Sequence, residues 1–378
     1  MRRSWKTSKF FFASVSFLSI LLLLSLPSIG FTGPKKLEVF DPPGKDPTKH
    51  VVPATEKDFW FIDQDRKPYT ECWYYLAVAE NGTIFFCHFT LLRINWLINE
   101  YTLDFGLTLP DGKSLFFANG FKKSQVKFAT DRFEVKVGPN WVKGPIAEQK
   151  LHIEELGYII DLAFKEQVQP FREGNGKIYL DKAKDNYLDI TFEPAMRFEG
   201  TIETEGKKQP IKGWAYRDHV RQTFIATDFA KQLRAFRVNL GELFISALEY
   251  YPIPEFTPNR VPVLIVTYKN KLLHLSNSYD FTTTAEYKDP KTATKVPRSF
   301  KLTDQEGAFH LECSTNGKLL QRIDYLESVN ALLKKALKWA GIRSYGYVFE
   351  EEAKCKIDSP EISGTYSGKG VLEVLDSE

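Results

Sequence analysis

The chain has 378 residues, in which 51 lysines and arginines nearly balance 48 aspartates and glutamates. No basic block is interleaved with aromatic residues, so the chain lacks the pattern of a nucleic-acid-binding protein and we expect no nucleic-acid partner. Four cysteines in a chain of this length also exclude a disulfide-rich scaffold.

Residues 1–30 predict an export segment. Arg2, Arg3 and Lys6 give a basic start, residues 10–26 are uncharged and mostly apolar, and small residues stand at positions 28 and 30. This pattern is typical of a secretory signal peptide. A retained N-terminal anchor is the alternative, because the apolar run reaches the lower length limit for crossing a bilayer. In either case we expect the rest of the chain to be exported, as a periplasmic, secreted or envelope-anchored protein.

The clearest hairpin signal is a pair of aromatic-rich apolar runs on either side of Asn81-Gly82. A two-residue turn at this position places Cys87 opposite Leu76. We therefore expect no cross-strand bridge between Cys87 and Cys72.

Short strand-like runs broken by turn residues continue through both halves of the chain, and the halves share a loose repeat of this pattern. Many short strands with little helix are typical of a β-sandwich or closed barrel, and the length suits two domains. We predict an all-β chain of two tandem antiparallel β-barrels. Residues 31–57 would form a linker or arm, 58–209 domain 1, and 210–378 domain 2. Cys313 and Cys355 both fall in strand-like sequence of domain 2, so we expect that they can form a disulfide.

One helix is predicted to interrupt the strands. In residues 323–340 apolar residues recur at helical spacing, and Gly341 suits the end of the helix. We expect an amphipathic helix that packs on the C-terminal barrel. Its lysines and Trp339 leave contact with a membrane surface as the alternative.

Aromatic residues are abundant, with 30 Phe, 17 Tyr and 7 Trp. Bulky aromatic side chains can line a barrel cavity that binds an elongated apolar molecule. They can equally fill two hydrophobic cores and pair across strands. Composition leaves both interpretations open.

Metal and cofactor motifs do not occur in the sequence. The histidines are scattered without the spacing of a metal site, and no cysteine pair has zinc-ligand spacing. No phosphate-binding loop, dinucleotide fingerprint or nucleophile elbow is present. We therefore expect neither a metal nor a cofactor.

Residues 212–224 concentrate the groups that can carry chemistry. On a strand, alternate side chains share a face. One face then carries Trp214, Tyr216 and Asp218, and the other carries Arg217, His219 and Arg221. A carboxyl group among aromatic residues on the inner face of a barrel has a raised pKa and can donate a proton at neutral pH. The alternative is a structural ion pair, in which Arg217 or Arg221 holds Asp218.

Two motifs resemble the AttH/CrtC family, whose members include carotenoid 1,2-hydratase, also called hydroxyneurosporene synthase. The first is Glu71-Cys72-Trp73-Tyr74, where the family has Glu-Trp-Trp-Tyr. The second begins at Gly213, where the family has Gly-x-x-Tyr-x-Asp-His-Asn-x-Gly and this chain keeps Tyr216, Asp218 and His219. The resemblance implies a tandem of two lipocalin-like β-barrels over nearly the whole mature chain.

The chain also departs from these motifs. Cys72 replaces the first Trp, and Val220 and Gln222 replace the Asn and Gly that follow the Asp-His pair. The inferred fold tolerates such changes, whereas the inferred catalysis is weakened by them. Relatives imply carotenoid hydration, polyketide cyclisation in lipocalin-like fungal proteins, and lipid handling in a yeast survival-factor group, so the fold alone does not select a reaction.

Three hypotheses follow. The first is an exported lipocalin-like protein that binds an apolar ligand, such as a lipid, a carotenoid or another isoprenoid, in a barrel cavity. The second is a hydratase or cyclase, such as a carotenoid 1,2-hydratase-like lyase, that uses Asp218 as the proton donor for an isoprenoid-like substrate. A structural role at the cell envelope is the third, and only the predicted helix supports it. The expected catalytic residues are Asp218, His219 and Tyr216, and the expected ligand-binding residues are Trp214, Trp73, Tyr74, Glu71 and Arg221.

Overall fold

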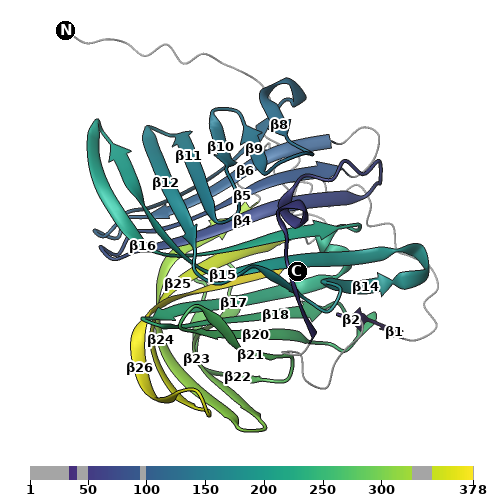
Figure 1. Cartoon of the computed structure of the whole chain (residues 1–378), viewed down its shortest axis with the longest axis vertical. Helices are drawn as coiled ribbons and strands as arrows, with labels where there is room; N and C mark the ends of the chain where they lie inside the picture. Colours follow the sequence, from purple (N-terminus) through teal and green to yellow (C-terminus); the bar gives the residue numbers. More distant parts are fainter. Residues whose placement is uncertain (1–33, 41–49, 94–98, 326–342, 378) are drawn as a thin grey trace.

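The computed structural model describes residues 34–40, 50–93, 99–325 and 343–377. These residues form two large antiparallel β-sheets with a few short 3₁₀ turns (Figure 1). The two sheets stack on each other and give one nearly closed barrel and one half-barrel, which confirms the predicted all-β architecture. Among these residues no helix is long and apolar enough to cross a membrane.

The first sheet has 15 strands, of which four short ones lie off its main path. In spatial order the main path is β7 (Ser114–Phe121), β6 (Asn99–Thr108), β5 (Ile84–Arg93), β4 (Tyr69–Ala79), β16 (Lys207–Gln222), β15 (Asn186–Thr204), β12 (Tyr158–Glu166), β11 (Glu148–Glu155), β10 (Asn140–Lys143), β9 (Glu134–Val137) and β8 (Val126–Phe128). The four short strands are β2 (Glu38–Val39), β3 (Val51–Pro53), β13 (Phe171–Glu173) and β14 (Lys177–Asp181).

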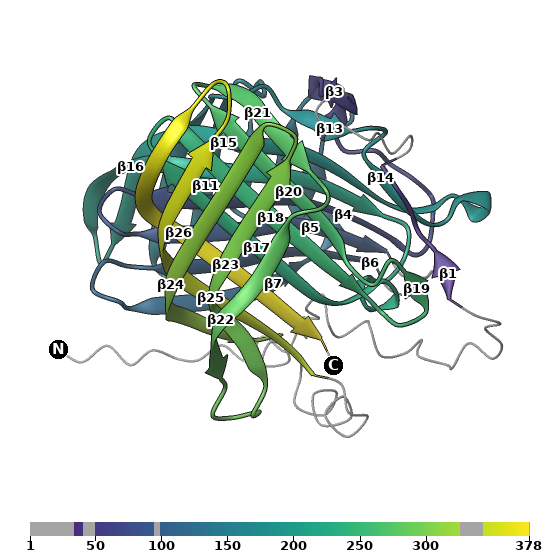
Figure 2. The ribbon, with the colours of Figure 1, turned by 90° about the horizontal axis from the view of Figure 1, so that it is seen from below.

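The second sheet has nine strands and is built entirely from the C-terminal part of the chain (Figure 2). Its order is β21 (Lys271–Ser276), β20 (Val261–Tyr268), β18 (Leu243–Pro252), β17 (Ala230–Leu240), β26 (Ser363–Ser377), β25 (Ser344–Asp358), β24 (Phe309–Asp324), β23 (Lys295–Glu306) and β22 (Asp280–Lys288). A separate two-stranded pairing joins β1 (Lys35–Lys36) to β19 (Phe256–Thr257).

Burial patterns show where the two sheets meet. Strands β11 and β12 alternate between buried and exposed residues, because one face packs on a core and the other meets solvent. Strand β4 and the central part of β16 are buried on both faces instead. The second face of these strands packs in a hydrophobic cluster that also contains residues of β18, β20 and β25. The interface between the sheets therefore lies over β4 and β16.

The division between the sheets differs from the predicted domain boundary. Residues 203–209 form the tip of the β15–β16 hairpin, with its turn at residues 205–206, and β16 pairs with both β15 and β4 of the first sheet. The chain passes to the second sheet between Gln222 and Ala230. The polar turn was mistaken for a linker because its composition is the same as that of a domain connection.

The described part of the predicted arm pairs with two regions of the chain. Strands β2 and β3 pair with β14 and β13 of the first sheet. Strand β1 pairs with β19, which lies in the connection between β18 and β20 of the second sheet.

The hairpin at Asn81-Gly82 has a register that differs by one residue from the prediction. Cys87 pairs with Tyr75 rather than with Leu76, because the loop has three residues and Gly82 adopts a positive φ of 90°. The conclusion about cysteines is unaffected: Cys72 and Cys87 are both free.

Cys313 and Cys355 form a disulfide, as expected. They are direct cross-strand partners on β24 and β25, with 4.0 Å between their Cα atoms. The predicted helix at 323–340 begins within β24, which extends to Asp324, and residues 326–340 lie outside the described part of the chain.

Candidate ligand site between the two sheets

Strand β16 carries the Asp-His segment through the middle of the first sheet. Every residue from Gly213 to His219 is buried. The predicted alternation is observed, since Asp218 faces the second sheet while Arg217 and His219 face the core of the first. One strand therefore presents polar groups to two separate interiors.

A cavity of about 260 Å³ lies between the sheets, slightly below the roughly 300–1,000 Å³ typical of ligand pockets. Its walls come from strands of both sheets, so the cavity exists only when both halves are folded together. Most of the lining is apolar or aromatic, including Phe86, Phe224, Phe229, Leu233, Leu248, Ile323, Val348 and Leu375.

Arg237 on β17 is the centre of the polar part of this cavity. Its Nη1 donates to Glu373 Oε2 at 2.6 Å, and the Tyr74 hydroxyl donates to the same oxygen at 2.6 Å. Its Nη2 lies 3.7 Å from Asp218 Oδ2. The guanidinium also lies over the Tyr216 ring, 4.0 Å from its centroid. Arg237 therefore lies closer to Glu373 than to Asp218.

Burial is the largest cause of the pKa shifts of Asp218 and His88 in the cavity. It raises the pKa of Asp218 to about 6, although Arg237 and Tyr216 act in the opposite direction. Burial also lowers the pKa of His88 to about 4, so this imidazole is neutral at neutral pH. The cavity therefore offers a carboxyl group that exchanges its proton near neutrality and a neutral imidazole.

The opposite face of β16 holds a separate buried network. His219 Nε2 lies 3.0 Å from Glu71 Oε1, and Arg221 Nε donates to the same oxygen at 3.1 Å. His219 Nδ1 lies 2.8 Å from the carbonyl oxygen of Asp58, and the Trp73 ring stacks on the imidazole at 4.8 Å. Both ring nitrogens of His219 are therefore occupied within the first sheet.

These positions correct part of the predicted site. Since His219 and Asp218 lie on opposite faces of β16, His219 cannot orient or reload the carboxyl group as expected. Glu71, Trp73 and Arg221 belong to the interior of the first sheet with His219 and do not line the cavity. A one-residue shift along a strand is enough to move a side chain from one interior to the other.

The remaining predicted residues lie at or near the cavity. Asp218 and Tyr74 line it, and Tyr216 lies beside it beneath Arg237. Trp214 points toward the second sheet but packs edge to face on Phe244 at 5.7 Å, outside the cavity lining.

The structural alternative for Asp218 named the wrong arginines. Arg217 forms a buried ion pair with Glu193 and donates to Gln149 Oε1 at 2.8 Å and to the Tyr75 hydroxyl at 3.2 Å. The arginine that faces Asp218 is Arg237, which comes from the other sheet.

Sequence reasoning missed Arg237, Glu373 and His88. Arg237 and Glu373 each stand as a single charge inside an apolar strand, Ala235–Val238 and Val371–Leu375. That pattern could have flagged both residues, because a charge in a buried strand needs a partner. His88 is one of the scattered histidines, which lack the spacing of a metal site in the sequence.

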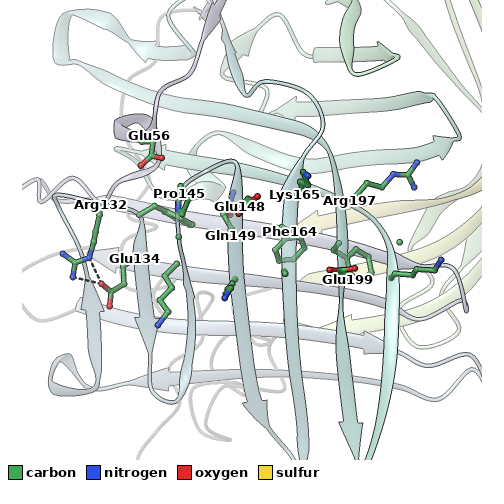
Figure 3. Close-up of a pocket in the computed structure, with 18 of the residues that line it drawn as sticks. Glu56, Arg132, Glu134, Pro145, Glu148, Gln149, Phe164, Lys165, Arg197 and Glu199 are labelled. Carbon is green, nitrogen blue, oxygen red and sulfur yellow. Dashed lines mark hydrogen bonds and ion pairs between the residues drawn. The ribbon is translucent and has the colours of Figure 1, made fainter.

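A larger groove of about 1010 Å³ lies elsewhere, on the surface of the first sheet across β9 to β16 (Figure 3). Charged side chains of both signs stand along it, and Arg132 donates to Glu134 at 2.9 Å. Because charged side chains make up much of its lining, we do not assign an apolar ligand to this groove.

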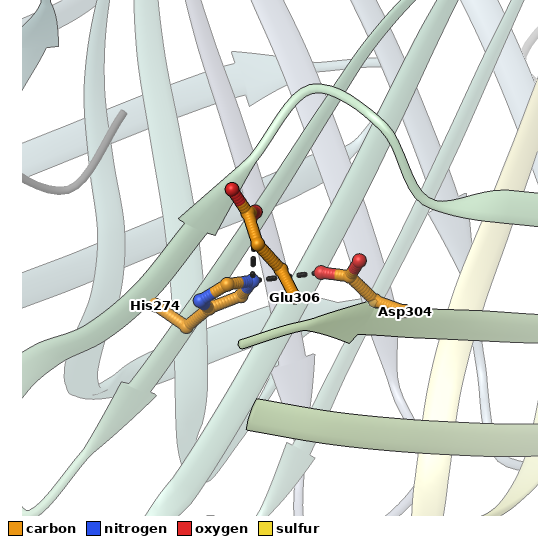
Figure 4. Close-up of side chains that lie close together, drawn as sticks. All are labelled: His274, Asp304 and Glu306. Carbon is orange, nitrogen blue, oxygen red and sulfur yellow. Dashed lines mark hydrogen bonds and ion pairs between the residues drawn. The ribbon is translucent and has the colours of Figure 1, made fainter. Parts of the chain in front are cut away.

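His274, Asp304 and Glu306 form a cluster that the scattered histidines of the sequence did not predict (Figure 4). The His274 Nε2 atom lies 2.7 Å from Asp304 Oδ2 and 4.0 Å from Glu306 Oε2. The imidazole stacks on Phe309 at 3.8 Å. The nitrogen that would bind a metal is thus hydrogen-bonded to a carboxylate, and we assign no metal to this cluster.

Solved structures with the same fold are lipocalin-like. A protein assigned as AttH from Nitrosomonas europaea superposes with a TM-score of 0.63 at 15% identity, over 88% of this chain and 97% of that one. Kievitone hydratase from Nectria haematococca has a TM-score of 0.56 at 12% identity, over 86% and 96% of the two chains. CghA, in a structure with Sch210972, has a TM-score of 0.55 at 9% identity, over 86% and 98%.

These likenesses confirm the tandem lipocalin-like fold and the resemblance to AttH. A search of curated protein sequences found no match. The sequence model of the Svf1 family matches residues 45–374, which span both sheets and the cavity between them. The chain therefore belongs to the Svf1 family.

Proposed function

We propose that the protein binds an elongated apolar small molecule in the cavity between its two sheets. The observation that carries this proposal is a mostly apolar space between the sheets whose lining includes a buried charged group, Asp218 with Arg237 and Glu373. Apolar walls supply affinity, and a few placed polar groups fix the orientation of a ligand. A lipid, a carotenoid or another isoprenoid meets this description.

Cavity filling tests the proposal. Ala235 is buried in the cavity wall, so Ala235→Phe should expel a ligand that the wild-type protein retains. Ala230→Phe, at a half-buried wall position, is a second variant in case the first fails to fold. Ala163→Phe makes the same change in the open surface groove and serves as the control.

The measurement is native mass spectrometry and solvent extraction of each purified variant. Wild type and Ala163→Phe should release the same apolar compound, and the two cavity variants should release much less. A wild-type protein that carries no such compound, and that does not bind the fluorescent apolar probe N-phenyl-1-naphthylamine in the cavity, would refute the proposal.

A second candidate function is general-acid catalysis, as in a hydratase. The supporting observation is that the pKa of Asp218 lies near 6, which suits proton transfer at neutral pH. In such a step the carboxyl proton adds to one carbon of an alkene, water adds to the other, and the water returns a proton to the carboxylate. Kievitone hydratase shares the fold, but at 12% identity the likeness extends to the fold only.

Binding is preferred over catalysis because of Arg237. The π faces of Tyr216 and Tyr74, which could stabilise a cationic intermediate, already lie under this guanidinium. A fixed positive charge at that place opposes the formation of a carbocation. Deuterium incorporation from D₂O into apolar cell extracts would distinguish the candidates: wild type would label a component and Asp218→Asn would not if catalysis occurs.

We also propose that the protein acts after export. The signal-like residues 1–30 and the Cys313–Cys355 disulfide support this proposal, since disulfides persist mainly in oxidising compartments. N-terminal sequencing of the mature protein would test both export and cleavage. An intact N-terminus on a protein recovered from the cytosol would contradict the proposal.

A further inference from the structure

A row of four side chains crosses the cavity side of the first sheet. Asp218 on β16 pairs with Tyr74 on β4, Tyr74 pairs with His88 on β5, and His88 pairs with Asp104 on β6. Directly paired residues of neighbouring strands point to the same face. With about 4.8 Å between strands, the Cα atoms of the two aspartates are about 14 Å apart. The row thus ends in a carboxyl group on each side.

The Asp104 end has unused hydrogen-bonding capacity. Among the residues that the structure describes, neither Asp104 Oδ1 nor Thr102 Oγ1 has a hydrogen-bond partner, although both atoms are fully buried. The two residues are 8% and 1% exposed and share a face of β6. An unpartnered buried polar atom is destabilising, so groups of this kind in a native fold call for an explanation, such as a ligand.

Three members of the row, Asp218, Tyr74 and His88, line the cavity, and Asp104 lies beside His88 just beyond the lining. His88 lines the cavity, and its ring packs on the Tyr74 ring at 4.7 Å. Tyr325 also lines the cavity; burial, followed by Asp104 and Glu373, raises the pKa of its hydroxyl. The neutral imidazole and the Tyr325 ring therefore connect the Asp218 end with the Asp104 end.

We propose that Asp104, Thr102 and His88 form a second polar subsite that binds a hydroxyl or similar hydrogen-bonding group at the far end of the ligand. This inference rests on the proposed binding function and makes it more specific. The ligand is an elongated apolar molecule with a polar group at each end. One end contacts Asp218 and Arg237, and the other contacts Asp104 and Thr102.

The test compares a ligand with two polar ends to a ligand with one. Decane-1,10-diol and decan-1-ol compete with N-phenyl-1-naphthylamine for the wild-type protein and its variants. Thr102→Val removes one hydroxyl with little change in shape, and Asp104→Leu removes the carboxyl group. Thr108→Val is the matched control, because its hydroxyl lies on the same strand and face but already contacts Ser114 Oγ at 3.0 Å.

Wild type should bind decane-1,10-diol about tenfold more tightly than decan-1-ol. The second hydroxyl of the diol would form one additional hydrogen bond at the subsite. Thr102→Val and Asp104→Leu should remove this preference and leave the affinity for decan-1-ol within about twofold of wild type. Thr108→Val should keep the preference. If Asp104→Leu does not fold, Thr102→Val and Asp104→Asn give the same comparison.

Three results would overturn the inference, and they can be distinguished from one another. Equal wild-type affinity for the two compounds, or an unchanged preference in Thr102→Val and Asp104→Leu, would exclude the second subsite while the binding function stands. Failure of the wild type to bind the probe and both alcohols would remove the binding function and the subsite together.

Discussion

Replacing Asp218 by asparagine should stabilise the protein at alkaline pH. Burial raises the pKa of this carboxyl group from an ordinary value of 3.8 to about 6. Between these values the folded state holds the proton more tightly than the unfolded state, so stability falls as the pH rises through this window. At 1.36 kcal/mol per pKa unit, the ionised carboxylate lowers the free energy of unfolding by about 3 kcal/mol above pH 6.

Asparagine resembles the protonated acid and does not ionise. At pH 8, Asp218→Asn should therefore exceed wild type in free energy of unfolding by about 3 kcal/mol, and the two proteins should converge near pH 4. Urea denaturation followed by tryptophan fluorescence at both pH values measures the difference. All other buried carboxyl groups are the same in both proteins, so the difference in free energy of unfolding comes from position 218.

An exposed aspartate, Asp65, provides the control for this prediction. Asp65 has a side chain that is 98% exposed, and Asp65→Asn should change the stability little at either pH. If Asp218→Asn is instead less stable than wild type at pH 8, the contact between Asp218 and Arg237 is a net stabilising ion pair. The residue would then belong to the scaffold, and the reasoning from burial would be refuted.

Three further predictions concern the scaffold. Arg217→Met should lower the free energy of unfolding by about 3–5 kcal/mol, because it leaves the buried carboxyl group of Glu193 without its partner. Arg132→Met, on the surface, should change the free energy of unfolding little. Urea denaturation of both variants measures the difference. Removing the disulfide with Cys313→Ser and Cys355→Ser together should cost up to about 4 kcal/mol for a sequence separation of 42, as measured by the urea midpoint with and without reductant. Gly213→Ala should prevent soluble folding in an expression assay, because its Cβ atom would lie 2.0 Å from a backbone oxygen of β4.

Local pattern predicted much of the fold. Alternating strand sequence and turn residues indicated an all-β chain, and the period of two correctly separated the faces of β16 around Asp218. The register of the first hairpin was wrong by one residue, because a three-residue loop and a two-residue turn share the same Asn-Gly sequence. The chain changes sheet only after Gln222, beyond the predicted boundary, because a polar hairpin turn and a linker have similar composition.

Only part of the site could be predicted from the sequence. Asp218 and Tyr74 stand in recognisable motifs, but their partners Arg237 and Glu373 come from the other sheet and are joined to them only by packing. Glu373 lies 299 positions from Tyr74, a separation over which periodicity carries no information. His88 could be placed near the site only after the register of β4 and β5 was known.

The two faces of β16 show why Asp218 differs from the other charged residues of its strand. A charge buried on a central strand must find its partners inside the protein. Arg217 has a carboxylate, an amide and a hydroxyl within hydrogen-bond distance, and Arg221 has a carboxylate and two carbonyl oxygens.

Asp218 faces one guanidinium at 3.7 Å, which is bonded more closely to Glu373, and Tyr216 also lowers the pKa of its carboxyl group. Arg217 and Arg221 therefore each have more oxygen partners than Asp218 has donors. A carboxyl group that shares its one guanidinium with a second carboxylate can accept a hydrogen bond from a ligand. This sparser pairing supports the proposed ligand in the cavity that Asp218 lines.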